Sequence, residues 1–137
     1  MVAELKRVLK SERWPDGSVI ARPDGIPWTP WALPGSYFKL LHLNRAIGMT
    51  VALIKMDPCE KTPPHHHFGD AIVYVMEGVL TVTNTETKTS FTVKAGDFVA
   101  EMENTWHYGE NKGTVPVKLF VIDEVPHGVT SNLVPRK

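Results

Sequence analysis

The chain has 137 residues, which is the size of one ordinary domain and short for two. Fifteen basic and fifteen acidic residues cancel, and neither sign is collected into a block, which argues against a surface built for nucleic acid or for an anionic membrane. We therefore expect a small molecule as the partner, with no nucleic acid and no membrane.

The amino-terminal ten residues carry charges every few positions and contain no apolar stretch long enough for a signal peptide or a membrane span. The single cysteine, Cys59, has no second cysteine with which to form an internal disulfide, as fits a reducing compartment. Together these features predict a cytoplasmic protein.

Residues 1–36 are interrupted by proline and glycine, which leave no room for a long helix or a regular sheet strand. We predict an extended N-terminal arm over 1–36, followed by the main domain over 37–137. The arm also carries Trp14, Trp28 and Trp31. Large aromatic rings are rarely left in water, so the arm packs either on its own domain or across a subunit interface, where tryptophan is enriched. The second alternative predicts a homodimer.

From Phe38 onward, short β-branched and aromatic runs alternate with turn residues. This pattern predicts strands near 38–43, 50–56, 71–76, 79–83, 88–93, 98–101, 106–110 and 115–123. Regular spacing without a helical period indicates an all-β protein, an antiparallel sandwich or barrel. The inward positions of a small barrel can hold a metal.

Three histidines carry most of the functional information. His65 and His67 are two residues apart, so on a strand their imidazoles point to the same face. His107 lies 40 positions downstream of His67 and could close a metal site between them. Neutral imidazole suits zinc, iron, copper or nickel.

These histidines stand in two motifs that resemble those of the cupin superfamily of small β-barrels. The first family motif is G(X)5HXH(X)3-4E(X)6G and the second is G(X)5PXG(X)2H(X)3N. The matching positions are His65, His67, Gly78, Gly96, His107 and Asn111. The departures are Cys59 and Ala71 in the first motif, at a glycine and the glutamate, and Met102 and Asn104 in the second, at the proline and a glycine.

The resemblance covers about residues 50–122, with the motifs over 59–78 and 96–111. It implies a double-stranded β-helix, the cupin jelly-roll barrel, with a metal held inside by His65, His67 and His107. The family's usual fourth ligand is the motif-one glutamate, which Ala71 replaces. Asp70 is one residue early and would face away on a regular strand, unless a bulge turns it inward. We therefore expect an open site of three imidazoles, with Asp70 as the first alternative carboxylate.

Such a site is similar to that of the three-histidine iron cupins, which include thiol dioxygenases and dioxygenases of diketones and aromatic ketones. The resemblance implies a non-haem iron(II) dioxygenase acting on a small enolisable carbonyl or phenolic compound, with zinc, nickel or manganese as alternative metals. Glu101 and Tyr108 flank the third histidine and are the candidate catalytic residues, as proton carriers or as partners that fix an imidazole tautomer.

Three other functions stay open from the sequence. The same metal could hold a ligand in a non-catalytic binding or sensor protein. It could also serve as a Lewis acid in an isomerase or lyase of a sugar-like or keto acid, which would need an acid or base in the cavity. The barrel could finally be degenerate and bind no metal.

Overall fold

The computed structural model describes residues 10–67, 69–124 and 133–135. Every strand expected from Phe38 onward is present, and no end differs from its expected position by more than two residues. These strands are β4 (Ser36–Asn44), β5 (Met49–Met56), β7 (Ala71–Glu77), β8 (Val79–Asn84), β9 (Ser90–Lys94), β10 (Phe98–Glu101), β11 (His107–Glu110) and β12 (Val117–Glu124). Two short strands, β6 (His65–His67) and β13 (Leu133–Pro135), complete the barrel.

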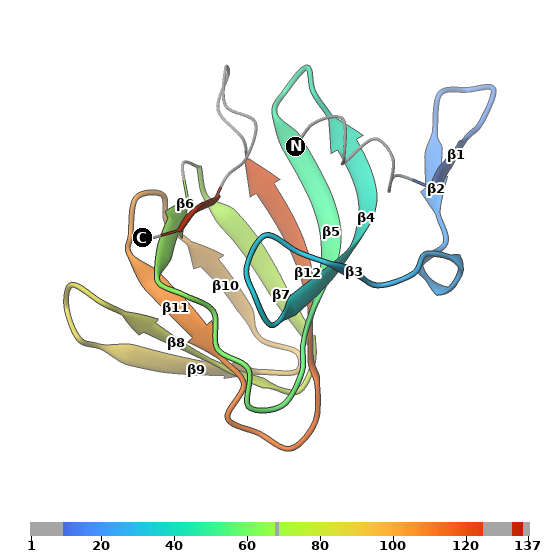
Figure 1. Cartoon of the computed structure of the whole chain (residues 1–137). Helices are drawn as coiled ribbons and strands as arrows, with labels where there is room; N and C mark the ends of the chain where they lie inside the picture. Colours follow the sequence, from blue (N-terminus) through green and yellow to red (C-terminus); the bar gives the residue numbers. More distant parts are fainter. Residues whose placement is uncertain (1–9, 68, 125–132, 136–137) are drawn as a thin grey trace.

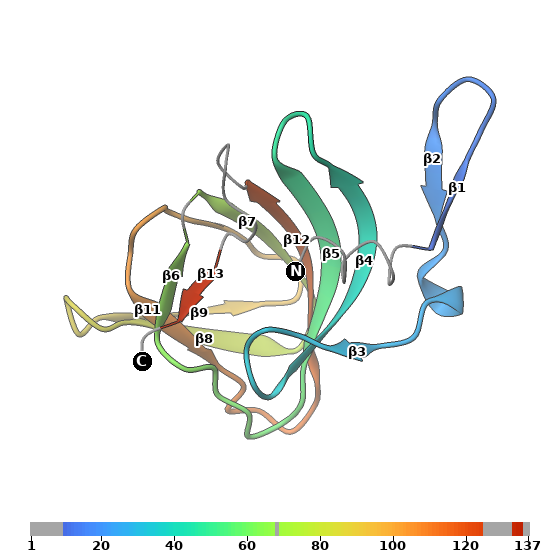
Figure 2. The same cartoon turned by 45° about the horizontal axis from the view of Figure 1, so that its top comes forward.

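Two antiparallel sheets form this barrel, as Figures 1 and 2 show. The larger sheet has the order β10-β7-β12-β5-β4-β3, and the smaller has the order β13-β6-β11-β8-β9. Neighbours in these orders are often distant in sequence, as the pairing of β12 with both β5 and β7 illustrates. The fold is the double-stranded β-helix that the sequence predicts.

The core lies between the two sheets and follows from strict alternation along the strands. In β12, Val117, Leu119 and Val121 are buried, whereas Lys118 and Phe120 between them are only partly so. The same period of two places one apolar face of each long strand inside the barrel. The buried core consists of Phe38, Leu40, Ile54, Met56, Val73, Val75, Leu80, Val82, Val117, Leu119 and Val121.

The N-terminal arm contains more regular structure than its prolines suggest. It forms the short strands β1 (Ser11–Arg13), β2 (Val19–Ala21) and β3 (Thr29–Pro30), with a single 3-10 turn at Pro23–Gly25. The expectation that no sheet strand fits there is therefore wrong at these three places. β3 is an edge strand, where proline is tolerated because one side needs no backbone donor. The far end of the β1–β2 hairpin projects from the barrel in both views, whereas β2 also approaches β4 (Figures 1 and 2).

The tryptophans of the arm have different surroundings. Trp31 packs against the core of its own barrel. The ring of Trp28 is faced by Lys39 Nζ at 4.8 Å from the centroid and by Lys55 Nζ at 5.2 Å. Trp14, on the projecting hairpin, is 52% exposed. The arm thus packs on its own domain at least through Trp28 and Trp31, and the homodimer stays a prediction.

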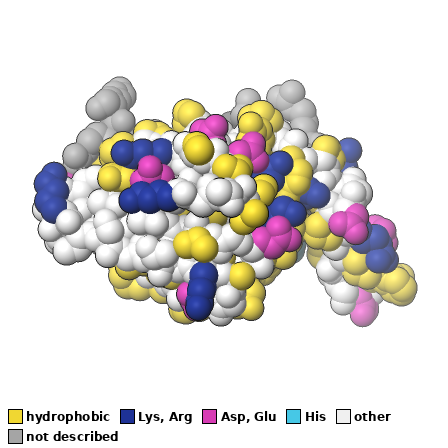
Figure 3. Space-filling view, turned by 90° about the horizontal axis from the view of Figure 1, so that it is seen from below, with side chains coloured by type: hydrophobic (Ala, Val, Ile, Leu, Met, Phe, Trp, Pro, Cys, Tyr) yellow, Lys and Arg dark blue, Asp and Glu magenta, His cyan; other side chains and the backbone are white. Residues whose placement is uncertain are grey.

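The surface mixes charges of both signs. On the face in Figure 3, basic and acidic side chains are interspersed with hydrophobic ones, which agrees with the balanced composition. Within the described ranges, no helix is long and apolar enough to cross a membrane.

Backbone conformation explains two departures from the cupin-like motifs. Gly78 and Gly96, which match motif glycines, have φ values of 80° and 93°. Cys59 and Asn104 stand where the motifs have glycine, and their φ values are 68° and 61°. All four motif positions thus lie in the left-handed region, which glycine enters without steric cost and asparagine tolerates. Cysteine has no such tolerance, so Cys59 is strained.

Replacing Cys59 by glycine is expected to stabilise the protein. The left-handed conformation costs a non-glycine residue about 1–2 kcal/mol, and the extra freedom of glycine in the unfolded chain offsets part of the gain. We expect Cys59→Gly to raise the free energy of unfolding by up to about 1 kcal/mol and the melting temperature by roughly 4 °C. Cys59→Ala is the control, because it removes the thiol but keeps Cβ. Equal stability of the two variants in thermal unfolding would show that strain is not the cause.

Candidate metal centre

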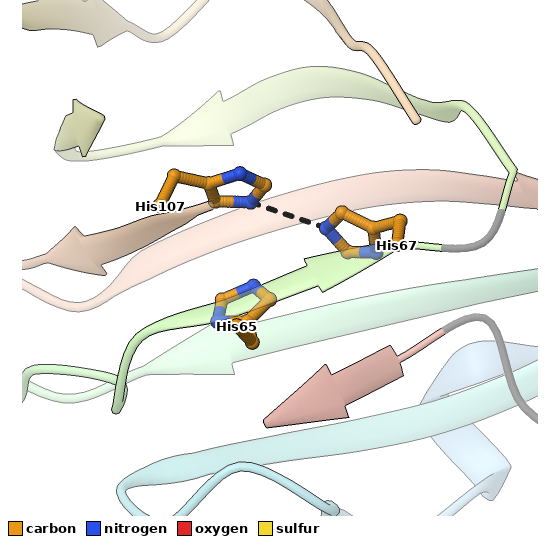
Figure 4. A group of neighbouring side chains, drawn as sticks. All are labelled: His65, His67 and His107. Carbon is orange, nitrogen blue, oxygen red and sulfur yellow. Dashed lines mark hydrogen bonds between the residues drawn. The ribbon is translucent and has the colours of Figure 1, made fainter. Parts of the chain in front are cut away.

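The structure brings His65, His67 and His107 together inside the barrel (Figure 4). His65 and His67 lie on β6 with 4% exposure each, and the middle residue, His66, is on the opposite face against the ring of Trp106. β11 pairs with β6 so that His107 lies opposite His65. One ring nitrogen from each of the three histidines lies within 4.8 Å of the others. Strand parity and sheet register therefore produce the cluster that the spacing predicts.

Backbone carbonyls orient two of these imidazoles. His65 Nδ1 lies 2.9 Å from the carbonyl oxygen of Pro63, and His107 Nδ1 lies 2.9 Å from that of Thr105. A carbonyl oxygen only accepts, so Nδ1 carries the proton in both rings and Nε2 of the neutral ring keeps its lone pair. Partners of this kind fix the ring orientation and tautomer of metal-binding histidines.

The charge state of His65 also suits a metal ligand. Burial disfavours the imidazolium and lowers the pKa of His65 to about 4, with a smaller lowering contribution from the neighbouring His107 and His67. The hydrogen bond to Pro63 opposes this shift only in part. His65 is therefore neutral near pH 7, which is the form that binds a divalent metal.

A carboxylate, that of Glu101, is in direct contact with two of the three histidines. Its Oε2 lies 2.8 Å from His107 Nε2 and 3.1 Å from His67 Nε2, and its side chain is 13% exposed. Burial alone would raise the pKa of this carboxyl group, but hydrogen bonds donated by His107 and His67 when their Nε2 atoms carry protons outweigh it and hold the pKa well below its usual range. Glu101 is therefore ionised inside the barrel.

One pair of histidine donor atoms is spaced as in a metal site. His67 Nε2 and His107 Nε2 are 3.2 Å apart. Neighbouring donors that are about 2.1 Å from a metal lie roughly 3.0 Å apart in an octahedron and roughly 3.4 Å apart in a tetrahedron. Three buried histidines whose ring nitrogens lie within 4.8 Å of one another, with Nδ1 held by carbonyls in His65 and His107, could hold a divalent metal ion.

The other expected site residues lie elsewhere. Asp70 Oδ1 accepts a hydrogen bond from the backbone N–H of Glu103 at 2.9 Å, so no bulge turns this carboxylate toward the histidines. Tyr108 follows His107 directly on β11 and is on the other face, where Lys61 Nζ lies 4.2 Å from its ring centroid. Neither residue is among the described residues that line the cavity. The structure thus gives Asp70 no ligand position and Tyr108 no access to the reacting centre.

A cavity opens next to the histidines, with an empty volume of about 550 Å³ including its solvent-filled mouth. Its walls are mostly apolar, and the sequence did not single out Trp31, Thr62 or Asp123 as part of them. Trp31 reaches the cavity from the arm, which no local pattern reveals. Beyond the histidines and Glu101, the walls consist of Trp31, Leu33, Ser36, Ile54, Met56, Thr62, Ala71, Val73, Leu80, Val82, Gly109, Leu119, Val121 and Asp123.

Solved structures of low sequence identity share this fold. The polyketide cyclase RemF from Streptomyces resistomycificus has a TM-score of 0.70 at 14% identity, covering 86% of this chain and 87% of its own. KdgF from Halomonas sp. has a TM-score of 0.63 at 18% identity, covering 77% and 93%. An RmlC-like cupin protein from Ralstonia eutropha has a TM-score of 0.65 at 22% identity, covering 85% and 78%.

No functionally curated protein shows significant similarity to the chain. The sequence model of the cupin domain matches residues 52–123, which is more than half of the chain and includes both motifs and all three histidines. The chain therefore belongs to the cupin family.

Proposed function

We propose that this protein is a metal-dependent cupin that acts as an iron(II) dioxygenase on a small enolisable carbonyl or phenolic compound. The observation that carries the proposal is the set of three buried imidazoles beside an apolar cavity. His65, His67 and His107 would hold the metal, which supplies Lewis-acid stabilisation of negative charge when bound. Imidazole ligands suit iron(II) as well as zinc or nickel.

The cavity walls favour an apolar substrate over a sugar. Apart from the three histidines and Glu101, its polar side chains are Ser36, Thr62 and Asp123, and the other walls are aliphatic side chains, Met56, Gly109 and the ring of Trp31. A sugar acid would leave many hydroxyl groups without partners there, at a cost for each buried polar group. The carbon skeleton of an aromatic or alkyl ketone would pack against the apolar walls, and its oxygen atoms would point toward the metal.

Oxygen uptake by the iron-loaded protein tests this function. We would load wild-type protein with iron(II) anaerobically and measure oxygen consumption with diketones, hydroxylated aromatic ketones, thiols and sugar acids. Consumption with a diketone or a phenolic ketone, and none in His107→Ala, is the expected result.

The other outcomes point to the rival functions. Turnover of a keto acid without oxygen would identify a lyase or isomerase. Metal binding with no turnover of any substrate would identify a binding or sensor protein. If neither wild type nor His107→Ala retains iron, zinc, nickel or manganese, the metal-dependent function fails as a whole.

A further inference from the structure

We propose that Glu101 is a fourth protein ligand of the metal and supplies from β10 the carboxylate that Ala71 cannot. The inference rests on the metal site proposed above and adds a ligand to it. Its evidence is the pairing of two strands and the three contacts among Glu101 Oε2 and the Nε2 atoms of His67 and His107.

The register of the larger sheet places Glu101 next to Ala71. β10 and β7 pair antiparallel, with Glu101 opposite Ala71 and Val99 opposite Val73. Residues directly opposite in such a pair point to the same face, with Cβ atoms about 5 Å apart. Ala71 is 2% exposed, and its methyl group leaves space at the metal side of the barrel. The longer side chain of a glutamate on the neighbouring strand can reach across the distance between the two strands. Glu101 on β10 can thus place its carboxylate where a glutamate at position 71 on β7 would place one.

Three electron-pair donors meet at this point. His107 Nδ1 donates to Thr105, which leaves the lone pair of the neutral ring on Nε2. This Nε2 lies 2.8 Å from Glu101 Oε2 and 3.2 Å from His67 Nε2, and the third side of the triangle is 3.1 Å. Electron pairs this close need protons or a metal ion between them. A proton can lie between only one pair at a time, whereas a metal ion binds all three donors together.

The surroundings of the carboxylate lead to the same conclusion. Glu101 is largely buried, and the described residues that line the cavity include no lysine and no arginine. A buried carboxylate without a cationic partner is costly, and the ion pairs found for Glu101 are with His67 and His107. A divalent metal on the same histidines would neutralise it.

A fourth ligand changes what the site can bind. Three imidazoles and one carboxylate leave two positions open on an octahedral metal and reduce the net charge of a divalent site to a single positive charge. The expectation of an open three-imidazole site is then replaced. The preferred ligand is a monoanion that chelates through two oxygen atoms, such as the enolate of a diketone or the phenolate of a hydroxylated aromatic ketone.

Moving the carboxylate back to β7 tests the inference. The probe is cobalt(II), whose visible absorption reports ligand number and whose affinity is measured by titration. We expect Glu101→Gln and Glu101→Ala to weaken cobalt(II) binding by roughly tenfold to hundredfold and to change the absorption bands. The double variant Ala71→Glu/Glu101→Ala should recover affinity and bands. Glu103→Gln, which changes an exposed glutamate two residues away, is the matched control and should equal wild type.

Two results would overturn the proposal. One is unchanged cobalt(II) affinity in Glu101→Gln. The other is lowered affinity with unchanged absorption bands and no recovery in the double variant, which would make Glu101 a positioning residue that acts through the histidines. His107→Ala separates this failure from that of the metal site. If His107→Ala loses cobalt(II) while Glu101→Gln keeps it, only the fourth ligand is wrong, whereas retention of cobalt(II) by His107→Ala rejects the metal site itself.

Discussion

Protein loaded with a divalent metal is expected to unfold at a markedly higher temperature than the same protein treated with chelator. The ligands come from β6 and β11, which are brought together only in the folded barrel, so the unfolded chain has no preformed site. Free metal at about a hundred times its dissociation constant would add about 2.7 kcal/mol to the free energy of unfolding. For a domain of this size, the melting temperature would rise by roughly 10 °C.

Calorimetry of wild type, His65→Ala and His67→Ala, each with and without metal, measures this rise in melting temperature. Both variants should unfold at one temperature with or without metal, since each lacks one of the three imidazoles. His66→Ala is a matched control, because His66 lies between them in sequence but on the opposite face of β6. It should keep the full metal-dependent shift. A shift of equal size in His67→Ala would mean that the metal binds elsewhere.

Much of the barrel could be predicted from local pattern because each strand obeys the same period of two. In β7 and β12 it is burial that alternates, whereas the sequences AIVYVME and VKLFVIDE are apolar at most positions, so their β-branched and aromatic composition is what marks them as strands. The sequence does not predict the short strands β1, β2 and β3, because proline and glycine dominate their surroundings. They form through pairing in the hairpin and at the edge of β4, which is information that a local pattern does not contain.

In the candidate site, too, some residues are predictable from a single strand and others depend on how the strands pair. Parity along one strand predicts that His65 and His67 share a face, and the motif spacing brings in His107. The proximity of Glu101 to these histidines depends on which strand pairs with β7 and in which register. That choice is made by packing of the whole barrel, so the sequence indicates the neighbouring Asp70 as the alternative carboxylate, whereas the strand pairing places Glu101 beside Ala71 across the sheet. Parity could have excluded Tyr108, since it is adjacent to His107 on one strand.

Asn111 links the three ligands to the rest of the barrel, and its replacement is expected to cause a large loss of stability. The residue follows β11 directly and has no exposed surface. Its Nδ2 donates to the carbonyls of Met56 and Val115, and its Oδ1 accepts from the N–H of Gly113. Its backbone accepts a hydrogen bond from Cys59 and donates one to Glu60, in the loop that leads to β6. One side chain thus connects the strand of the third histidine to the approach of the first two.

Asn111→Ala removes three hydrogen bonds, one of them buried and two partly buried, and takes the side-chain partner away from each. At about 1 kcal/mol for each, the free energy of unfolding should fall by about 3 kcal/mol, and the melting temperature should fall by roughly 10 °C. Denaturant titration of the metal-free protein measures the loss without contribution from metal binding. Asn44→Ala is the matched control, because the Asn44 side chain accepts one hydrogen bond, from Ala46, in an exposed turn, and its loss should cost less than about 1 kcal/mol.

Asn111→Asp separates hydrogen bonding from packing at the same position. Aspartate keeps the shape of the side chain and the acceptor for Gly113, so no cavity forms. Its second oxygen, however, faces the carbonyl oxygens of Met56 and Val115, where the amide donated. The ionised form places negative charge against two buried acceptors, and the protonated form can donate to only one of them. Asn111→Asp should therefore be at least as destabilising as Asn111→Ala near pH 7. A near-wild-type Asn111→Asp would assign the role of this residue to shape alone.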